Sequence, residues 1–172
     1  MSFPKRRLAF LAVVLMGLSG LAGCQVRPLY ATSPGNAGPQ ADLPAISVQE
    51  ATTRVEQVFR NTLLFGLRGG GEGTDPRYEL IFRMTTREQA ALVERGTGTP
   101  NLYQLSGGVS FLLKDAATDN SIFGASVTAT DSYTRSSQSY SNIRAQRDAQ
   151  DRIAKALAAL TQARLAAYFA TH

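Results

Sequence analysis

Few side chains in this sequence are of the types that perform covalent chemistry. Its 172 residues include one cysteine, Cys24, and one histidine, His172, which is the last residue. A histidine at a chain end is poorly held, because chain ends fray. No serine lies in the Gly-x-Ser-x-Gly context of a hydrolase nucleophile. A zinc site is not expected either, because the chain has only one cysteine and one terminal histidine to serve as ligands. These observations argue against an enzyme and leave the thiol of Cys24 to be explained.

A glycine-rich segment, residues 66–73, is the next place where chemistry could occur. A phosphate-binding loop needs a lysine and a hydroxyl residue after its glycines, at the start of a helix. Here Glu72, Thr74, Asp75 and Pro76 are found instead. We interpret the segment as a flexible connection, and we expect neither a cofactor nor a metal ion.

Cys24 ends the run Leu21-Ala22-Gly23-Cys24, which follows a basic start at Lys5–Arg7 and an apolar stretch at Leu8–Leu18. This order is typical of a secretory signal peptide, and the stretch is too short for a permanent membrane span. The four residues resemble a lipobox, in which the cysteine sulfur receives a diacylglyceryl group, the leader is cleaved and the new amine is acylated, for example by palmitate. We predict that residues 1–23 are a lipoprotein signal peptide and that Cys24 is the lipidation site. The alternative is a free thiol just past an ordinary signal peptide, or a buried thiol in the fold.

Removal of the leader changes the charge of the chain. Lys5, Arg6 and Arg7 are three of the 18 basic residues, and all 13 acidic residues follow Cys24, so 15 basic residues remain and the balance is +2. Nucleic-acid-binding domains usually carry a clustered basic face. A balance of +2 does not indicate such a face, so we expect no nucleic acid as a partner. Two or more acyl chains hold a protein stably on a bilayer. Gln25, by resemblance to enterobacterial lipoproteins, favours the periplasmic side of the outer membrane.

The mature chain is predicted to begin with a tether, which a folded domain follows. Residues 24–44 are rich in proline and glycine and predict a lipid-anchored flexible tether, and residues 45–172 predict a single domain. The apolar run at residues 45–48 is a candidate first strand. Ser47-x-x-Glu50 has the form of a capping box that would begin a helix.

The predicted first helix extends from this capping box to about Leu64. Val55, Val58, Phe59 and Leu63 recur with helical spacing on one face. Two opposite-charge pairs with a spacing of four residues, Glu50 with Arg54 and Glu56 with Arg60, would lie on the other face. We expect this helix to pack on an apolar surface, with binding to a membrane as the alternative.

Three later segments alternate apolar and polar residues with a period of two, which indicates strands. They are residues 78–85, 102–114 and 122–133, separated by turn-rich segments at 95–101 and 115–120. Short connections predict an antiparallel meander. From about Asn142 to Ala170 a second helix is predicted, and its expected buried stripe is Ala149, Ile153, Ala156, Leu157, Leu160, Ala163 and Ala167.

The predicted order is strand, helix, three strands, helix. It indicates an α+β two-layer sandwich, with a mixed, largely antiparallel four-stranded sheet and two helices on one face. The opposite face would carry the arginine, threonine, serine and glutamine side chains of the strands and would be available to a partner.

The segment Cys24-Gln25-Val26-Arg27-Pro28-Leu29-Tyr30 resembles the mature N-terminus of the alphaproteobacterial branch of the lipopolysaccharide-assembly lipoprotein family LptE. Arg60-Asn61-Thr62-Leu63 in the first helix, Tyr78-Glu79-Leu80 at the second strand and the alanine-rich last helix agree with it. The resemblance implies a lipoprotein that plugs a large outer-membrane β-barrel, LptD, helps its assembly and contacts lipopolysaccharide on its way to the outer leaflet.

Phosphates and carboxylates of lipopolysaccharide call for arginine or lysine at exposed positions. Arg83, Arg87 and Arg95, on the second strand and the loop after it, are therefore candidate lipopolysaccharide-binding residues, with solvated surface charge as the alternative. The segment Ser132–Ser141 is either a second contact surface or a strand end followed by a helix cap.

From the sequence alone, other functions also remain open. An auxiliary lipoprotein of a lipid transporter, or a pilotin for another outer-membrane complex, would share the lipobox, the tether and a small α+β domain. Neither is expected to share Arg27-Pro28-Leu29-Tyr30. A structural lipoprotein that binds the cell wall is a third possibility without a signature here.

Overall fold

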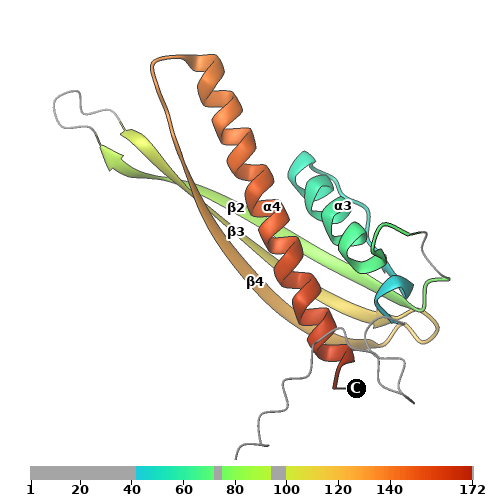
Figure 1. The fold of residues 1–172 in the computed structure, drawn as a ribbon. Helices are drawn as coiled ribbons and strands as arrows, with labels where there is room; N and C mark the ends of the chain where they lie inside the picture. Colours follow the sequence, from blue (N-terminus) through green and yellow to red (C-terminus); the bar gives the residue numbers. More distant parts are fainter. Residues whose placement is uncertain (1–41, 72–74, 94–99, 172) are drawn as a thin grey trace, which may run out of the picture.

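The structure is a computed structural model that describes residues 42–71, 75–93 and 100–171. In chain order its elements are the 3-10 helix η2 (Leu43–Ala45), β1 (Ile46–Val48), α3 (Arg54–Arg68), β2 (Tyr78–Val93), β3 (Pro100–Asp115), β4 (Ser121–Thr134) and α4 (Ser139–Phe169). The strands form one sheet in the order β1-β2-β3-β4. Strand β1 is parallel to β2, and the other neighbours are antiparallel. Both helices lie along one face of the long, twisted sheet, with α4 diagonal to the strands (Figure 1). The predicted α+β fold is confirmed.

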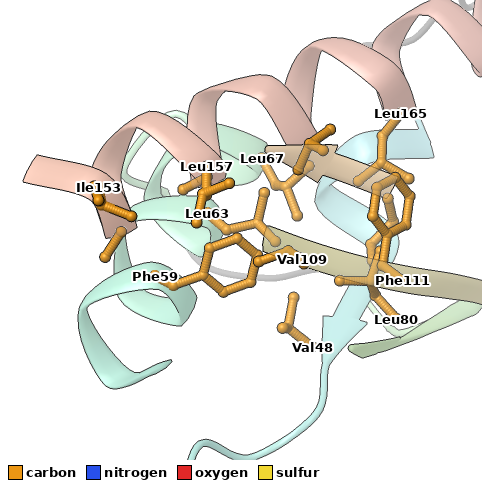
Figure 2. Close-up of a cluster of buried hydrophobic side chains, with 14 of the residues drawn as sticks. Val48, Phe59, Leu63, Leu67, Leu80, Val109, Phe111, Ile153, Leu157 and Leu165 are labelled. Atoms are coloured by element: carbon orange, nitrogen blue, oxygen red, sulfur yellow. The ribbon is translucent and has the colours of Figure 1, made fainter. Parts of the chain in front are cut away.

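The core lies between this sheet face and the two helices. Side chains alternate between the faces of a strand, so Leu80, Val109 and Val127 all face the helices from successive strands and are buried. Figure 2 shows Phe59, Leu63 and Leu67 of α3 in the same cluster as Ile153, Leu157 and Leu165 of α4. Each such side chain contributes roughly 1.5–3 kcal/mol when fully buried. Leu43 also belongs to this core, so packing begins within the range that we assigned to the tether.

Gly107 permits the close approach of α4 to the middle of β3. A Cβ atom built at Gly107 would lie 2.5 Å from Cγ2 of Ile153 and 3.0 Å from Cδ1 of Leu157. The first contact is shorter than packed side chains show, and the second is tight. The glycine is therefore required by the helix that crosses above it.

The start of α3 differs from the prediction. The capping box is formed by Thr53 and Glu56, not by Ser47 and Glu50. Oγ1 of Thr53 accepts a hydrogen bond from the backbone N–H of Glu56 at 3.3 Å, and the carboxylate of Glu56 accepts one from the N–H of Thr53 at 3.0 Å. Ser47 remains in β1, where its hydroxyl donates to the carbonyl of Tyr78. Because β1 pairs with β2, Ser47 stays in the sheet and does not cap the helix.

The predicted ion pairs along α3 are also wrong. Arg54 pairs with Asp151 of α4 at 2.7 Å, and Arg60 donates to the backbone carbonyls of Val48 and Gln49. Both arginines therefore join α3 to neighbouring elements, because a packed helix offers partners that an isolated helix lacks.

The predicted stripe of α4 is correct in its first half only. Ala149, Ile153 and Leu157 are buried, but the buried set then continues through Ala158, Thr161, Leu165 and Ala166. Leu160 is 43% exposed, and Ala156, Ala163 and Ala167 are exposed as well. A spacing of four residues advances about 40° per step around a helix of 3.6 residues per turn. The buried stripe consequently winds around α4 along its length. The helix also begins at Ser139, earlier than Asn142.

Candidate functional site

Two of the predicted binding residues lie on the face of the sheet that the helices leave uncovered, which we call the open face. Arg83 and Arg87 are both on β2, and both are exposed. They alternate with Phe82 and Met84, which pack against the core on the other side. Arg95 and the lipidation site Cys24 lie outside the described residues. The predicted position of the two arginines on a polar sheet face is thus correct.

On the open face, each of the two arginines lies in register with hydroxyl side chains of the neighbouring strands. Arg83 is opposite Ser110 of β3, which is opposite Ser126 of β4, and the two serine hydroxyls are 3.1 Å apart. Arg87 is opposite Ser106, whose hydroxyl donates to the backbone carbonyl of Arg87 at 3.3 Å. The face therefore presents cations at one side and hydroxyl groups beside them.

A shallow depression of about 370 Å³ lies between these rows, next to Gly108. Gly108 is flanked by Thr85 of β2 and Thr128 of β4 in the register of the sheet, and it contributes no side chain to fill the space. A Cβ atom there would meet Oγ1 of Thr85 at 3.5 Å, which is an ordinary contact. The wall also includes Arg87 and Thr130. The depression is a place where a small polar group of a ligand could approach the backbone.

The charge of the open face is positive near this depression. Within the described part of the chain, neither Arg83 nor Arg87 forms an ion pair, whereas six other basic–acidic contacts are formed elsewhere. Glu79 lies at the opposite end of the same face, across from Lys114. An unpaired, exposed guanidinium is well suited to a phosphate or a carboxylate, because its fork of donors matches their geometry.

An apolar row lies on the open face between the row of Glu79 and the row of Arg83. Leu112 of β3 is 37% exposed, next to Ile81 of β2 in the register of the sheet. Gly124 of β4 completes this row, and Leu112 reaches across it, with Cδ1 at 3.2 Å from a Cβ atom built there. The apolar row borders the row of Arg83. The open face therefore combines an apolar row with a cationic, hydroxyl-rich middle, an arrangement suited to an amphiphilic anion.

A second polar cluster joins the far ends of the strands to α4. Arg135 donates to Glu88 of β2 and to the hydroxyl of Tyr133, each at 2.7 Å, and Gln146 of α4 donates to the same carboxylate at 2.7 Å. Burial and then the neighbouring Glu88 raise the pKa of Tyr133, so its hydroxyl stays protonated at neutral pH. This cluster was not predictable from the sequence, because Glu88 is far from Arg135 and Gln146 in the chain. Each member is bonded internally, so we interpret it as structural.

The segment Ser132–Ser141 is a strand end followed by a helix start. Residues 132–134 close β4, and the N-terminus of α4 follows at Ser139. Between them, the side chain of Asn142 accepts from the N–H of Ser136 at 2.7 Å and donates to the carbonyl of Ser136 at 2.8 Å. Local hydrogen bonds thus involve Ser136, Gln138 and Ser141 of this segment.

Other chemistry is sparse in the described regions. Over those residues, no group of three His, Cys, Asp or Glu side chains could hold a metal ion. None of the described helices is both long enough and apolar enough to cross a membrane.

Comparison with known proteins gives a family and a fold. The family model LptE, described as lipopolysaccharide-assembly, matches residues 43–165. The crystal structure of a proposed lipoprotein from Caulobacter crescentus CB15 is 25% identical, covers 80% of this chain and 100% of that chain, and has a TM-score of 0.67. A minor lipoprotein from Acinetobacter baumannii is 20% identical over 72% of this chain and 89% of its own, with a TM-score of 0.51, and supports the fold alone. No curated protein matches the sequence.

Proposed function

Because the chain belongs to the LptE family of lipopolysaccharide-assembly proteins, we propose that it is an outer-membrane lipoprotein, anchored through Cys24, that plugs an LptD-type β-barrel. In this position it helps the barrel to assemble and takes part in moving lipopolysaccharide to the outer leaflet. The anchor, the tether that begins at Cys24 and ends before Leu43, and the single domain after it are parts of the same proposal. No catalytic step is involved.

The observation that carries the proposal is the composition of the open face. Lumens of outer-membrane barrels are polar, so a plug needs a polar surface and not a broad apolar patch. The open face supplies this surface, with serine and threonine side chains on three strands. It also leaves Arg83 and Arg87 exposed and without an ion pair among the described residues.

The same face supports direct contact with lipopolysaccharide. The phosphates of lipopolysaccharide would bind to Arg83 and Arg87, and Arg95, which follows them in the sequence, would extend the cationic surface. The apolar row at Leu112 and Ile81 is adjacent to Arg83, so an acyl chain and a phosphate of one molecule could be contacted together. The depression at Gly108 would accept a sugar hydroxyl beside Thr85 and Thr128.

Charge reversal at the arginines tests lipopolysaccharide binding. The variants Arg83→Glu/Arg87→Glu and Arg87→Glu/Arg95→Glu should each bind lipopolysaccharide about ten- to a hundredfold more weakly, because each removes charge-assisted hydrogen bonds worth roughly 1.5–3 kcal/mol. A matched control is Arg144→Glu/Arg147→Glu, which makes the same charge change at exposed positions of α4. Binding is measured by titration of purified protein with labelled lipopolysaccharide at fixed salt. Equal affinity in all variants would reject the open face as the binding surface.

A further inference from the structure

Strand β4 is an edge of the sheet, and alternate residues on it point their backbone groups away from β3. Among the described residues, β3 is the only strand that pairs with β4. The N–H of Arg135 donates to the carbonyl of Asn101 at 2.8 Å, in continuation of the register that pairs Thr134 with Leu102. Hydrogen-bonded pairs alternate in an antiparallel ladder, so odd-numbered residues of β4 bond to β3. The N–H and C=O groups of its even-numbered residues point outward.

Ser132 shows this orientation directly, and there the edge is blocked. Its N–H donates to Oδ1 of Asp131 at 2.7 Å, and its carbonyl accepts from Nη2 of Arg152 of α4 at 3.3 Å. Arg152 also donates through Nε to Asp131 at 2.6 Å. Side chains therefore occupy both outward backbone groups at this one position.

The edge next to this block has no comparable protection. Proteins usually guard edge strands with charged residues or proline against pairing with other chains. Residues 121–130 of β4 contain neither a charged residue nor a proline. The outward-facing positions there are Gly124, Ser126, Thr128 and Thr130. All four are exposed and uncharged, and among the described residues β3 is the only strand paired with β4.

An exposed apolar side chain of α4 lies level with the middle of this free edge. Arg152 of α4 contacts Asp131 of β4, and Tyr168 stacks on Phe123 with ring centroids 4.6 Å apart. The helix rises about 24 Å between these two contacts, and the strand advances about 26 Å, so the two elements run side by side. Leu160 is midway along this stretch of α4, above the middle of β4, and it is 43% exposed.

We propose that the free edge of β4 from Gly124 to Thr130 binds an extended segment of the LptD-type partner, which adds to the sheet as a fifth strand. Only an extended backbone matches a row of outward N–H and C=O groups at this spacing. The segment would be uncharged over about six residues, with an apolar side chain beneath Leu160. This inference rests on the proposed function for the identity of the partner.

Two other occupants fit the edge less well. The preceding part of this chain enters the domain at Asp42, beside β1 at the opposite edge of the sheet, and its Pro28, Pro34 and Pro39 could not donate to a ladder. A second copy would bring its own α4 on the same side of the sheet, whereas a single segment brings nothing above it. A single donated segment therefore meets least obstruction beside Leu160.

Amide hydrogen exchange of the purified complex with the LptD-type barrel tests the inference. We expect the amides of Ser126, Thr128 and Thr130 to exchange about tenfold or more slowly in the complex than in the free chain. A complex in which these amides exchange as in the free chain would overturn the inference alone, and failure to form a complex would overturn the proposed function with it. Slow exchange already present in the free chain would assign the edge to the chain's own N-terminal segment, or to a second copy if it depends on concentration, and would also overturn the inference.

A proline scan of the two sheet edges gives a second test. Thr128→Pro removes one outward N–H of β4 and should weaken the complex about tenfold. Thr86→Pro is the matched control, because even-numbered residues of β2 face the other edge, as the hydrogen bond from Gln49 to the carbonyl of Leu80 shows. Equal weakening by Thr128→Pro and Thr86→Pro would contradict strand addition at β4.

Discussion

The guanidinium carbon of Arg135 lies 3.9 Å from the ring centroid of Tyr103. The ring of Tyr103 in turn stacks on that of Tyr133, with centroids 5.7 Å apart. Arg135 is therefore held by an ion pair to Glu88 and by contact with the aromatic face of Tyr103. This contact joins the last residues of β4 to the start of β3 and the far half of β2, at the end of the sheet where α4 begins.

Replacement of Arg135 should loosen this end of the domain. A cation–π contact contributes about 0.5–2 kcal/mol, and a lysine would lose both the planar stacking and the forked hydrogen bonds. We expect Arg135→Lys to lower the free energy of unfolding by about 1 kcal/mol and Arg135→Ala by somewhat more. Urea unfolding followed by circular dichroism measures this change. An unchanged midpoint for both variants would show that the contact does not stabilise the fold.

The adjacent glycines of β3 should respond very differently to the same substitution. Gly107→Ala places a Cβ atom against Ile153 and Leu157, and overpacking of this kind costs about 1–3 kcal/mol. Gly108→Ala meets only ordinary contacts on the open face and should leave stability nearly unchanged, while it fills the depression. Thermal melts of the two variants give the comparison. Equal losses of stability would contradict the packing of α4 on Gly107.

The pair of Asp131 and Arg152 predicts a pH dependence of stability. Partial burial alone would raise the pKa of Asp131, but the hydrogen bonds from Arg152 and from the N–H of Ser132 outweigh it and hold the pKa below its ordinary value of about 3.8. A carboxyl group with a lowered pKa in the folded state stabilises the fold above its unfolded pKa, and this contribution disappears as the pH falls through the folded pKa.

Asp131→Asn should therefore be less stable than the natural chain at pH 7, with a difference that shrinks below about pH 4. Urea unfolding of both proteins at pH 7 and at pH 3 measures this difference. A gap of the same size at the two pH values would mean that the charge of Asp131 is not responsible.

The capping box of α3 offers a test in which the sequence and the structure disagree. Thr53→Ala should cost about 1 kcal/mol of stability, because an N-terminal amide of the helix loses its partner. Ser47→Ala removes only a hydroxyl that donates to the carbonyl of Tyr78 and should leave the helix start intact. Comparison of the two variants by urea unfolding decides between the caps. A larger loss for Ser47→Ala would favour the cap predicted from the sequence.

Local patterns predicted the order of elements correctly, since a strand period of two and a helical period are written into neighbouring residues. They could not choose between two equally good capping boxes. Ser47-x-x-Glu50 and Thr53-x-x-Glu56 have the same form, and the choice depends on the pairing of Ser47 with Glu79 in the sheet. That pairing joins residues far apart in the chain.

The buried stripe of α4 shows the same limit. From side-chain polarity alone, Leu160 is expected in the core and Thr161 at the surface. Instead, Thr161 is fully buried and Leu160 is exposed. The crossing of α4 over a twisted sheet and its contact with α3 determine which side is covered. For the candidate site, the alternation of β2 was enough to place Arg83 and Arg87 on the uncovered face. The depression at Gly108 depends on three strands in register and was not predictable.

The most direct test of the proposed function is recovery of the partner. The tagged, lipidated protein is purified from detergent-solubilised outer membranes at high salt, and the proteins that remain bound are identified and quantified. Our account predicts one large LptD-type β-barrel protein in a one-to-one ratio. Recovery of inner-membrane transporter subunits, or of the chain without any barrel protein, would contradict it.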